Sequence, residues 1–557
     1  MKTIVIVESP SKCKKIEYIL SQIDPNCRFI VRACCGHFRE IKSINTESFD
    51  VLYQTIPTKK KYVAYLKKIV KSKDVGEIIL ATDNDREGEA IAWHICQELR
   101  CPVNKTKRLR FNEISKAAIS NAYHSPSLID MNLVHAQSTR QIVDQWIGFT
   151  FSPKLASLFR NKSLSAGRCQ TPAVKLIYDN ETKRSQASTD TLFHCTVCFH
   201  PQHQFHLNQT FQNQSDGIEF MKQNKDFHHS LIKPFETSTS YRYPPKGLTT
   251  SKLQQFCSTY WKWSPTFTMQ QAQQLYENGY ITYHRTESTQ YNASFQKNVL
   301  TFIEETFGKE YKKQKVSWSE NKNAHESIHP INVYTEIKSN RLYEFIRKTT
   351  IQSLMENATF SNIHVKVTSP RKNYVFEKTF CTCEFEGFLK YDEKPPEKNI
   401  IPKTLSFEWI KLFEKHKEYI PHLNEAQVIQ QLEKLGIGRP STFASFISKI
   451  LQRKYVSKED ITENTQTVMT EYRIEKQDRD KITKKENPYV IQESQKLKLS
   501  DLGKKSVQYL YKNFEEFFDY DFTKSIEKSL DTIASGDCKK IDFLKSFYEK
   551  IKPHLTT

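Results

Sequence analysis

The sequence predicts a multidomain fold that combines an α/β unit, mainly helical parts and an interrupted β domain. The chain has 557 residues, enough for three or four domains at roughly 150 residues each. Its first segment alternates apolar runs with helical patterns, and further along two β-like blocks flank a helical stretch. These observations together indicate α/β plus mainly α architecture.

The first segment reads as strand, loop and helix, twice over. Residues 3–7 are an apolar run that ends in ESPSK, and KKIEYILSQI follows with helical periodicity. Residues 77–82 form a second buried-strand pattern, which the acidic stretch DNDREGE separates from the helical AIAWHICQEL. Such alternation is typical of parallel sheets, whose ligands bind at the carboxyl ends of the strands. Glu8 and the acidic stretch both fall at such ends.

A lysine-rich helical pattern at 58–74 lies between these two units. Tyr62, Leu66, Ile69 and Val70 share one face of the predicted helix, and seven lysines crowd the rest. A solvated basic face is the ordinary interpretation of this pattern, and a flank that faces phosphates is the alternative.

The pattern changes several times in the rest of the chain. Residues 113–182 are mostly helical, whereas 190–245 alternate in a β-like way. Helical signals return at SKLQQFCSTYWKW, and 362–390 form the second β-like block. The segment DEKPPEKNIIPK is typical of a linker, and 422–557 is predicted to be helical. We therefore expect one β domain made of two separated pieces, with the helical insert attached to it.

Composition favours an intracellular protein that binds a polyanion. Lys and Arg exceed Asp and Glu by 83 to 63, a net charge of +20, and nucleic acid is the commonest partner of so basic a chain. A merely lysine-rich, solvated surface is the alternative. No apolar run approaches the roughly 18–20 residues of a membrane span, and the N-terminus turns polar too early for a signal peptide. We expect a soluble, cytoplasmic protein with no membrane partner.

The thirteen cysteines are an odd number scattered along the chain, which argues against a disulfide framework. Cys195 and Cys198 form a C-x-x-C pair, but no second pair follows at the spacing of a zinc ribbon. We expect reduced thiols and no structural zinc.

Asp83, Asp85 and Glu87 are the first candidates for chemistry. Acids at i, i+2 and i+4, where a strand gives way to a loop, can converge on one side of the chain. Carboxylates held that close repel one another, so a hard divalent cation such as Mg²⁺ is their natural partner. Glu8 could add a fourth oxygen ligand or a proton-transfer group. The alternative is a solvated acidic loop with Arg86 as its counter-ion.

Tyr283, in GYITYHRTES, is the candidate nucleophile. A phenol is a weak nucleophile at neutral pH, and a nearby cation such as Arg285 can activate it and stabilise a phosphoryl transition state. Lys12 and His325 could contact the same phosphate, although a surface lysine and a structural histidine are the ordinary interpretations. Tyr280 would face the other way in an extended segment and is assigned to packing.

The motifs resemble, in their order, those of the type IA DNA topoisomerases, and most closely the bacterial topoisomerase I branch. They are ESPSK, LATDNDREGEAIAWHI, RFNEISKAAI, SAGRCQTPAV, GYITYHRTES, AHESIHP, LGIGRPSTFASFI and YDFTKSIEKSLDTIASG. The resemblance runs from residue 1 to about 550. The acidic motif alone would be shared with primases and nucleases that carry the same metal-binding Toprim fold, whereas the tyrosine motif would not.

The resemblance implies a role for each matching residue. Tyr283 matches the nucleophile that holds the 5′-phosphate, and Glu8 matches the acid that assists proton transfer at the 3′-oxygen and touches the metal. Asp83, Asp85 and Glu87 match the Mg²⁺ ligands, and Lys12, Arg285 and His325 match groups that act on the scissile phosphate. The positions that match binders of the single strand are His37, Arg140, Asp144, Ser165, Ala166, Gly167, Arg168, Cys169, Gln170, Arg439, Thr442 and Arg453.

The resemblance also implies a toroidal fold with a Rossmann-like Toprim domain at 1–125. Helical parts at 126–185 and 400–557 would form a DNA groove, and 186–254 with 361–399 would form a β arch. The insert at 255–360 would carry the nucleophilic tyrosine. Nucleophile and metal acids would then lie on different bodies, so that opening separates the ends of the broken strand.

The implied activity is relaxation of negatively supercoiled DNA by a monomer, through Mg²⁺-dependent cleavage of one strand. The sequence has no P-loop, which agrees with an ATP-independent reaction, and it does not show whether a helicase partner exists. The C-terminal zinc ribbons that are common in this branch are not in the sequence, and Cys169 stands where an aliphatic residue is usual. The alternatives are decatenation of the topoisomerase III kind, a Toprim nuclease, or a non-catalytic protein that binds single-stranded DNA.

Overall fold

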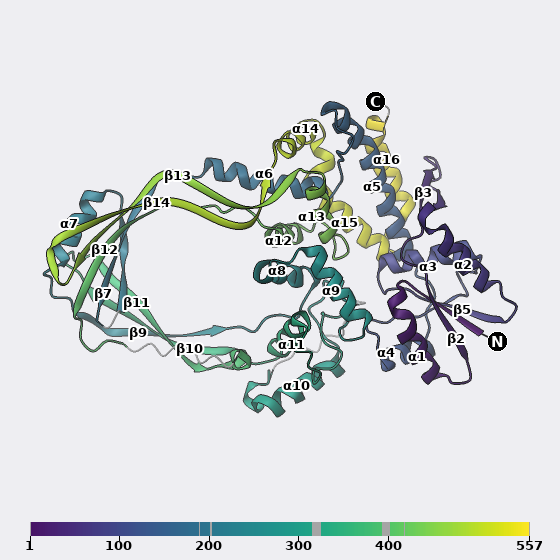
Figure 1. The fold of residues 1–557 in the computed structure, drawn as a ribbon, viewed down its shortest axis with the longest axis horizontal. Coiled ribbons are helices and arrows are strands. Elements are labelled where there is room, and N and C mark those ends of the chain that lie inside the picture. Colours follow the sequence, from purple (N-terminus) through teal and green to yellow (C-terminus); the bar gives the residue numbers. More distant parts are fainter. Residues whose placement is uncertain are drawn as a thin grey trace.

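The computed structural model describes residues 2–188, 190–200, 203–314, 325–392, 401–416 and 418–555. The chain follows a ring (Figure 1), with an α/β unit and a helical body at one end and a large sheet, reached by long strands, at the other. Among the helices described, none is both long enough and apolar enough to cross a membrane. The predicted linker DEKPPEKNIIPK lies mostly outside the described residues.

The N-terminal α/β unit contains a four-stranded parallel sheet in the order β2-β1-β5-β6. Its strands are β1 (Lys2–Val7), β2 (Arg28–Ala33), β5 (Val75–Ala81) and β6 (Lys107–Arg108). Its helices are α1 (Cys13–Ile23), α2 (Lys60–Val70), α3 (Arg86–Leu99) and α4 (Lys116–His124), and β3 (Arg39–Ile44) and β4 (Val51–Thr55) form a separate hairpin. Strand β1 is buried on both faces, as expected of a parallel sheet covered by helices. The predicted α/β fold of this segment is confirmed.

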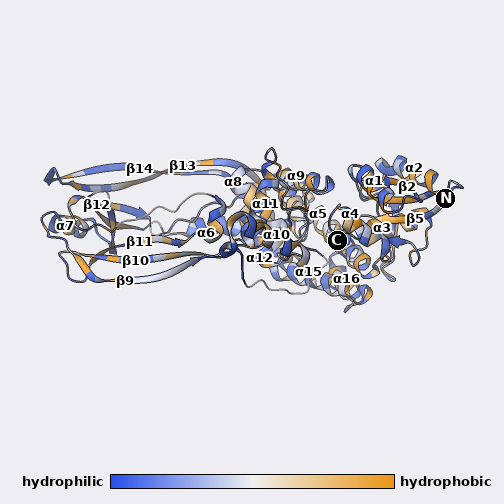
Figure 2. Ribbon diagram, turned by 90° about the horizontal axis from the view of Figure 1, so that it is seen from below, coloured by the Kyte–Doolittle hydropathy of each residue, from blue (hydrophilic) through white to orange (hydrophobic). Residues whose placement is uncertain are grey.

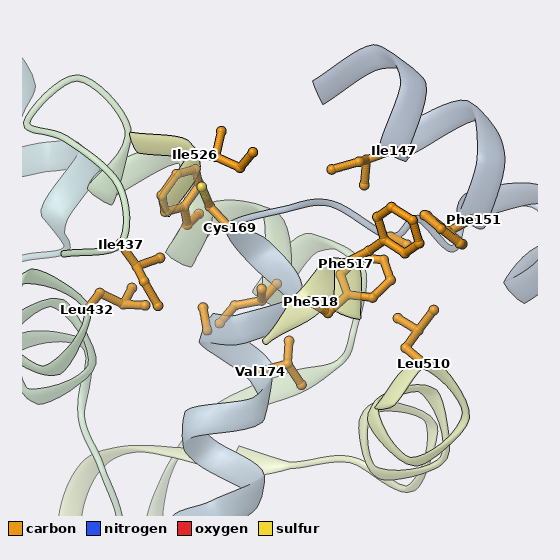
Figure 3. Close-up of a cluster of buried hydrophobic side chains, with 14 of the residues drawn as sticks. Ile147, Phe151, Cys169, Val174, Leu432, Ile437, Leu510, Phe517, Phe518 and Ile526 are labelled. Carbon is orange, nitrogen blue, oxygen red and sulfur yellow. The ribbon is translucent and has the colours of Figure 1, made fainter. Parts of the chain in front are cut away.

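A helical body follows the α/β unit. It consists of α5 (Met131–Leu158), α6 (Gln170–Gln186), α12 (Glu425–Leu435), α13 (Phe443–Gln452), α14 (Asp501–Phe518), α15 (Tyr520–Ser535) and α16 (Lys540–Leu555). Side chains from chain segments far apart in sequence, such as Phe151, Val174 and Phe518, meet in one core (Figure 3). Because this core draws on α5, α6 and α12–α16, it fixes the frame on which the loops between these helices are held.

The large sheet has eight antiparallel strands in the order β14-β13-β12-β7-β8-β11-β10-β9. They are β7 (Thr191–Phe199), β8 (His203–Phe211), β9 (Leu231–Arg242), β10 (Ala358–Thr368), β11 (Val375–Phe385), β12 (Phe407–His416), β13 (Val456–Glu475) and β14 (Asp478–Leu499). Helix α7 (Gln214–Asn224) adds Phe220 and Met221 to an aromatic core on this sheet. The β-like blocks predicted at 190–245 and 362–390 are both in the sheet.

Strands β13 and β14 correct the prediction that all of 422–557 is helical. The two strands pair with each other along most of their length, and β13 also pairs with β12. Both are mainly hydrophilic (Figure 2), so no alternation of apolar residues marks them as strands in the sequence. Each strand supplies the other's hydrogen-bond partners, and this tertiary pairing overrides local propensity. The sheet is therefore built from more pieces than the two predicted.

The helical insert between β9 and β10 contains α8 (Thr250–Trp261), α9 (Pro265–Glu277), α10 (Ala293–Phe307) and α11 (Arg341–Ser353). The short 3-10 helices in the described part of the chain are Pro10–Lys12, Pro57–Lys59, Lys309–Tyr311 and Gly387–Asp392. Part of the insert shares a hydrophobic core with the α/β unit, in which Leu275 and Tyr276 of α9 lie with Val5 and Ile79. The insert is thus closed onto the sheet edge where the acidic residues lie.

Candidate active site

The ends of strands β1 and β5 place the first group of acids. Glu8 directly follows β1, and Asp83 follows β5 by two residues. Asp85 caps α3, since its side chain accepts a hydrogen bond from the Gly88 amide at 2.7 Å. Only glycine fits at position 88, because a Cβ there would lie 2.0 Å from the Asp83 carbonyl oxygen. The tight turn therefore holds the acids at the sheet edge.

Glu8, Asp83 and Asp85 form one electrostatic group. Lys12, which is fully buried, makes an ion pair with Asp83. Burial, together with the charges of Asp83 and Asp85, raises the pKa of Glu8 to about 7. These three carboxylates repel one another, as acids that share one cation would.

Glu87 belongs to a different group of contacts. Its carboxylate lies 2.9 Å from Nε2 of His37 and accepts a hydrogen bond from the Gln137 amide at 3.0 Å. Burial works against ionisation of this acid, but the contact with His37 outweighs burial and holds the pKa of Glu87 at about 2. Arg140 lies 3.8 Å away on the other side. The structure therefore brings three of the four predicted metal acids together and directs Glu87 toward His37.

The donor chemistry of Glu8, Asp83 and Asp85 fits a hard divalent cation, because all three offer carboxylate oxygens that carry like charge. Across the described residues, no three His, Cys, Asp or Glu side chains already converge as metal ligands do. Lys12 and Tyr283 instead contact Asp83 and Asp85 in this arrangement. The chemistry of these carboxylates therefore suits a cation, but in this structure protein groups hold Asp83 and Asp85.

Tyr283 lies at the meeting point of the insert and the α/β unit. Its phenol donates a hydrogen bond to Asp85 at 2.6 Å, and its backbone N–H donates to the Asn112 carbonyl at 2.7 Å. Burial and the charge of Asp85 raise the pKa of Tyr283 well above its usual value, and Arg285 offsets only part of this. The phenol is therefore protonated in the closed arrangement, with its proton directed at a carboxylate.

Arg285 and His325 flank the phenol. Arg285 lies 3.7 Å from the same Asp85 carboxylate, and the His325 ring lies 5.6 Å from the Tyr283 ring, centroid to centroid. Tyr280, by contrast, is 42% exposed and packs against Tyr343. The segment expected to be extended makes only an isolated bridge at Ile281, and its two tyrosines nevertheless point to different surroundings.

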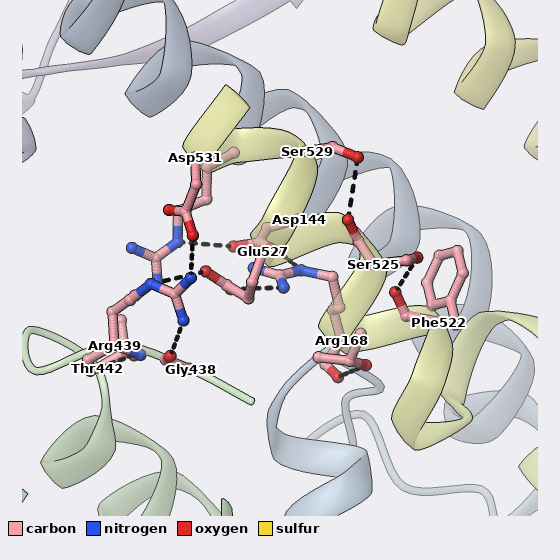
Figure 4. Close-up of polar contacts among 12 residues, drawn as sticks. Asp144, Arg168, Gly438, Arg439, Thr442, Phe522, Ser525, Glu527, Ser529 and Asp531 are labelled. Carbon is pink, nitrogen blue, oxygen red and sulfur yellow. Dashed lines mark hydrogen bonds and ion pairs between the residues drawn. The ribbon is translucent and has the colours of Figure 1, made fainter. Parts of the chain in front are cut away.

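Figure 4 shows an ion-pair network among Asp144, Arg168, Arg439, Glu527 and Asp531. Arg168, fully buried, bonds Asp144 at 2.9 Å and Glu527 at 2.7 Å. Arg439 pairs with Asp531, which also binds Arg86 of the α/β unit at 2.6 Å. Thr442 accepts a hydrogen bond from the Arg439 amide at 2.9 Å. Four residues predicted to bind the strand are thus fixed by one network that reaches the α/β unit.

A cavity of about 590 Å³ lies among α5, the loop before α6, and α13. Residues expected to hold the strand line it, namely Asp144, Ser165, Ala166, Gly167, Arg168, Cys169, Gln170 and Arg453. Phe149, also in its lining, is 70% exposed. The loop is held in place because Ser165 exchanges hydrogen bonds with the Tyr455 hydroxyl. A second cavity, of about 770 Å³, is lined by Asp85, Glu87, Arg140, Arg285, His325 and Arg439.

Several residues of the site were not predicted. Asn112, Gln137, Tyr276, Glu527 and Asp531 contact predicted residues or their rings. Asn112 lies in RFNEISKAAI, and Glu527 and Asp531 lie in YDFTKSIEKSLDTIASG. These three could have been found from the sequence, because they are polar residues inside motifs that were already recognised.

Gly279 is a close contact between the insert and the α/β unit, and a test of closure follows from it. Its φ is +68°, and a Cβ there would lie 2.7 Å from the Ile114 carbonyl oxygen. Gly279→Ala is therefore expected to push the insert away and expose the Tyr283 amide that bonds Asn112. Strain of about 1–3 kcal/mol corresponds to hydrogen exchange that is roughly five to 150 times faster in the peptide 280–286.

Gly308→Ala is the matched control for this test. Gly308 lies in the same insert and also has a positive φ, +115°, but its Cβ would meet only the Glu310 side chain. Equal acceleration at peptide 280–286 in both variants would mean that strain inside the insert, and not contact with the α/β unit, controls the exchange.

Comparisons with known proteins agree with this geometry. The family model described as DNA topoisomerase matches residues 128–486, and the Toprim domain model matches 3–114. A prokaryotic-type DNA topoisomerase 1 of Acanthamoeba polyphaga mimivirus is 32% identical over 99% of this chain and 71% of its own length. DNA topoisomerase 1 of Aquifex aeolicus is 30% identical over 98% of each chain. The structure of full-length topoisomerase I from Thermotoga maritima superposes with a TM-score of 0.81, at 28% identity, over 99% of this chain and 90% of that one.

Proposed function

Because the chain belongs to the type IA DNA topoisomerases, we propose that it relaxes negatively supercoiled DNA by Mg²⁺-dependent, ATP-independent transesterification at Tyr283. The observation that carries the proposal is the Tyr283 phenol, which donates to Asp85 at 2.6 Å while Arg285 and His325 flank it. A nucleophile, a proton acceptor and a phosphate-binding cation are therefore within reach of one position.

In the proposed reaction, the Tyr283 oxygen attacks the scissile phosphorus as the phenol proton passes to Asp85. The bond from phosphorus to the 3′-oxygen breaks, and Glu8 is placed to supply the proton that this oxygen takes up. Arg285, with Lys12 and His325, stabilises charge on the phosphoryl oxygens. Reversal of the same steps rejoins the strand, and the phosphotyrosine diester conserves the bond energy, so ATP is not needed.

The family depends on a metal ion, and Glu8, Asp83 and Asp85 would hold Mg²⁺ in this chain. When bound, Mg²⁺ supplies positive charge that offsets the three carboxylates and the phosphate. Glu87, held by His37 and Gln137, is proposed to support this group from the neighbouring set of contacts.

We propose that the single strand lies along the cavity beside α5 and passes the acids at their edge. Arg168 and Arg453 line the first cavity and Arg439 lines the second, so all three lie along that path. The strand-binding set comprises His37, Arg140, Asp144, Ser165, Ala166, Gly167, Arg168, Cys169, Gln170, Arg439, Thr442 and Arg453. The exposed ring of Phe149 offers a surface on which a base can stack.

The proposed division of labour is a Toprim domain at 1–125, a DNA-groove domain at 126–185 and 400–557, an arch at 186–254 and 361–399, and a tyrosine-bearing domain at 255–360. Within 400–557, however, β12, β13 and β14 are assigned to the arch and not to the groove domain, since these strands continue the arch sheet. With Tyr283 and the acids on different bodies, opening would part the cut ends while the protein, acting as a monomer, holds both.

The test is to incubate the protein with Mg²⁺ and end-labelled single-stranded DNA, and to stop the reaction with SDS. A covalent adduct at the 5′ end of the downstream fragment, together with relaxation of a negatively supercoiled plasmid without ATP, is expected. Free cleavage products without an adduct would indicate a nuclease instead. Binding with neither product would indicate a non-catalytic single-strand binder.

Asp83→Ala combined with Asp85→Ala should separate cleavage from the full cycle. We expect a reduced but detectable adduct, because the variant lacks Asp85 as proton acceptor while Tyr283 and Arg285 remain. We expect at least a hundredfold loss of plasmid relaxation, because two carboxylates proposed to hold the cation are also removed. Glu77→Ala, on strand β5 and paired with Lys107 at 2.8 Å, is the control and should relax plasmid normally. Full relaxation by the double variant would remove these acids from the metal site.

A further inference from the structure

Helix α2 carries an exposed basic and aromatic surface that the proposed reaction does not use. The α2 surface consists of Lys60, Lys61, Tyr62, Tyr65 and Lys68, and its two tyrosines are 49% and 50% exposed. Lys61, Tyr65 and Lys68 share one face because their spacing is i, i+4 and i+7. The opposite face buries Val63 and Leu66. Tyr62, predicted to lie on the apolar face, thus belongs to the exposed one.

The charge of this surface is not neutralised by the protein. Residues 59–73 contain seven lysines and no acid. Among the ion pairs of the described residues, Lys67 pairs with Glu98 at 2.6 Å, and none involves Lys60, Lys61 or Lys68. An ordinary solvated helix intersperses acids with its lysines, because like charges one turn apart repel. The α2 surface therefore presents uncompensated positive charge beside two aromatic faces.

A series of contacts connects α2 to the proposed active site. Lys59, at the start of the helix, donates to the Cys35 carbonyl at 2.8 Å. Two residues further along the same loop, His37 contacts Glu87. Arg140 lies 3.8 Å from both Glu87 and Asp144, and Asp144 lines the cavity proposed for the strand. Figure 1 shows α2 next to α3, on the side of the α/β unit away from the large sheet.

We propose that the α2 surface binds the single-stranded nucleic acid that leaves the active site past His37. Lys60, Lys61 and Lys68 contact its phosphates, and Tyr62 and Tyr65 stack on its bases. Ammonium groups and exposed aromatic rings together are what single-strand binding without sequence preference requires. This inference rests on the proposed function, because it continues the strand path proposed there.

The experiment measures binding of a fluorescein-labelled 36-nucleotide single strand as a function of NaCl, by anisotropy, in Tyr283→Phe protein so that no cleavage occurs. One variant combines Lys60→Gln, Lys61→Gln and Lys68→Gln, and another combines Tyr62→Ala and Tyr65→Ala. The control combines Lys504→Gln, Lys505→Gln and Lys512→Gln, which removes three exposed lysines from α14. Circular dichroism and the Tm verify that all variants fold.

The lysine variant is expected to lower the slope of log K against log salt by about 2, since each lost phosphate contact on a single strand contributes about 0.7. The tyrosine variant is expected to weaken binding about tenfold with little change in slope. The α14 control should keep the slope of the parent protein.

Equal loss of slope in the α2 and α14 variants would overturn the proposal, since net charge alone would then explain it. The proposal would also be overturned if the α2 variants bound single strands normally but bound duplex DNA more weakly. The same holds if they bound single strands normally but lost binding to phosphatidylserine vesicles. A failure of the proposed function is distinguishable, because it appears as native protein that forms no covalent adduct. If only this inference fails, protein with Tyr283 intact forms the adduct, while the α2 variants bind the single strand with the same salt dependence as the α14 control.

Discussion

Replacing Tyr283 with phenylalanine is expected to abolish the covalent protein–DNA adduct and plasmid relaxation, below the limit of detection. The substitution removes one oxygen, the atom proposed to bond the phosphorus, and keeps the ring that packs against Tyr276 and His325. SDS-trapped adduct on 5′- and 3′-labelled single strands, with a gel assay of plasmid relaxation, measures the effect. Binding of the single strand should survive, because Arg285 and the ion-pair network are untouched.

Tyr280→Phe is the matched control, three residues away in the same motif. Its ring is 42% exposed and contacts Tyr343, so loss of its hydroxyl should leave adduct yield unchanged. Adduct formation by Tyr283→Phe, or its loss in Tyr280→Phe, would assign the nucleophile to another residue.

The second large effect is expected on stability, at Glu89. This carboxylate is fully buried and accepts from Arg108 at 3.0 Å, from Arg110 at 3.0 Å and from the Asp130 amide at 3.1 Å. Arg108 is itself 0% exposed, so Glu89→Ala leaves a buried guanidinium without its carboxylate. We expect the α/β unit to lose about 3–5 kcal/mol of its free energy of unfolding. Hydrogen exchange of amides in β1 and β5, which open with this unit, measures the loss.

Glu77→Ala supplies the comparison. Its pair with Lys107 has the same kind of partners, but the two side chains are 38% and 48% exposed. Exposed pairs contribute about 0.2–1 kcal/mol, so exchange from the same strands should change little. If Glu89→Ala lowered the free energy of unfolding no more than Glu77→Ala does, local rearrangement would have given the Arg108 charge water or another partner.

The α/β fold and the position of Glu8, Asp83 and Asp85 could be predicted because local patterns determine them. Parallel strands place their carboxyl ends at one edge, so acids that follow two strands must meet there. The direction of Glu87 could not be predicted in this way, because its partners His37 and Gln137 come from other elements. Nothing in the local sequence distinguishes an acid that faces a cation from one that faces a histidine.

Two further features depend on contacts between distant segments. Asp531 binds Arg86, which is 445 residues away in the sequence, and no periodicity in either segment predicts the pair. Strands β13 and β14 were assigned to helix because their lysines, glutamates and threonines do not alternate with apolar residues. Tyr283 and Arg285 can be paired from their spacing, whereas the place of His325 beside the Tyr283 ring depends on a contact across the insert that local pattern does not determine.

The core shared by α9 and the α/β unit gives the ring a restoring force. Leu275, Tyr276 and Tyr283 are buried there with Val5 and Ile79. Separating the insert from the α/β unit would therefore expose this apolar surface to water, which costs free energy. Opening therefore costs free energy and closing regains it, so the cycle requires no nucleotide. In the proposed reaction, torsional tension in underwound DNA would favour the open state, and this tension falls with each strand passage. We therefore expect the rate of relaxation to be highest on the most underwound DNA and to fall as that DNA relaxes.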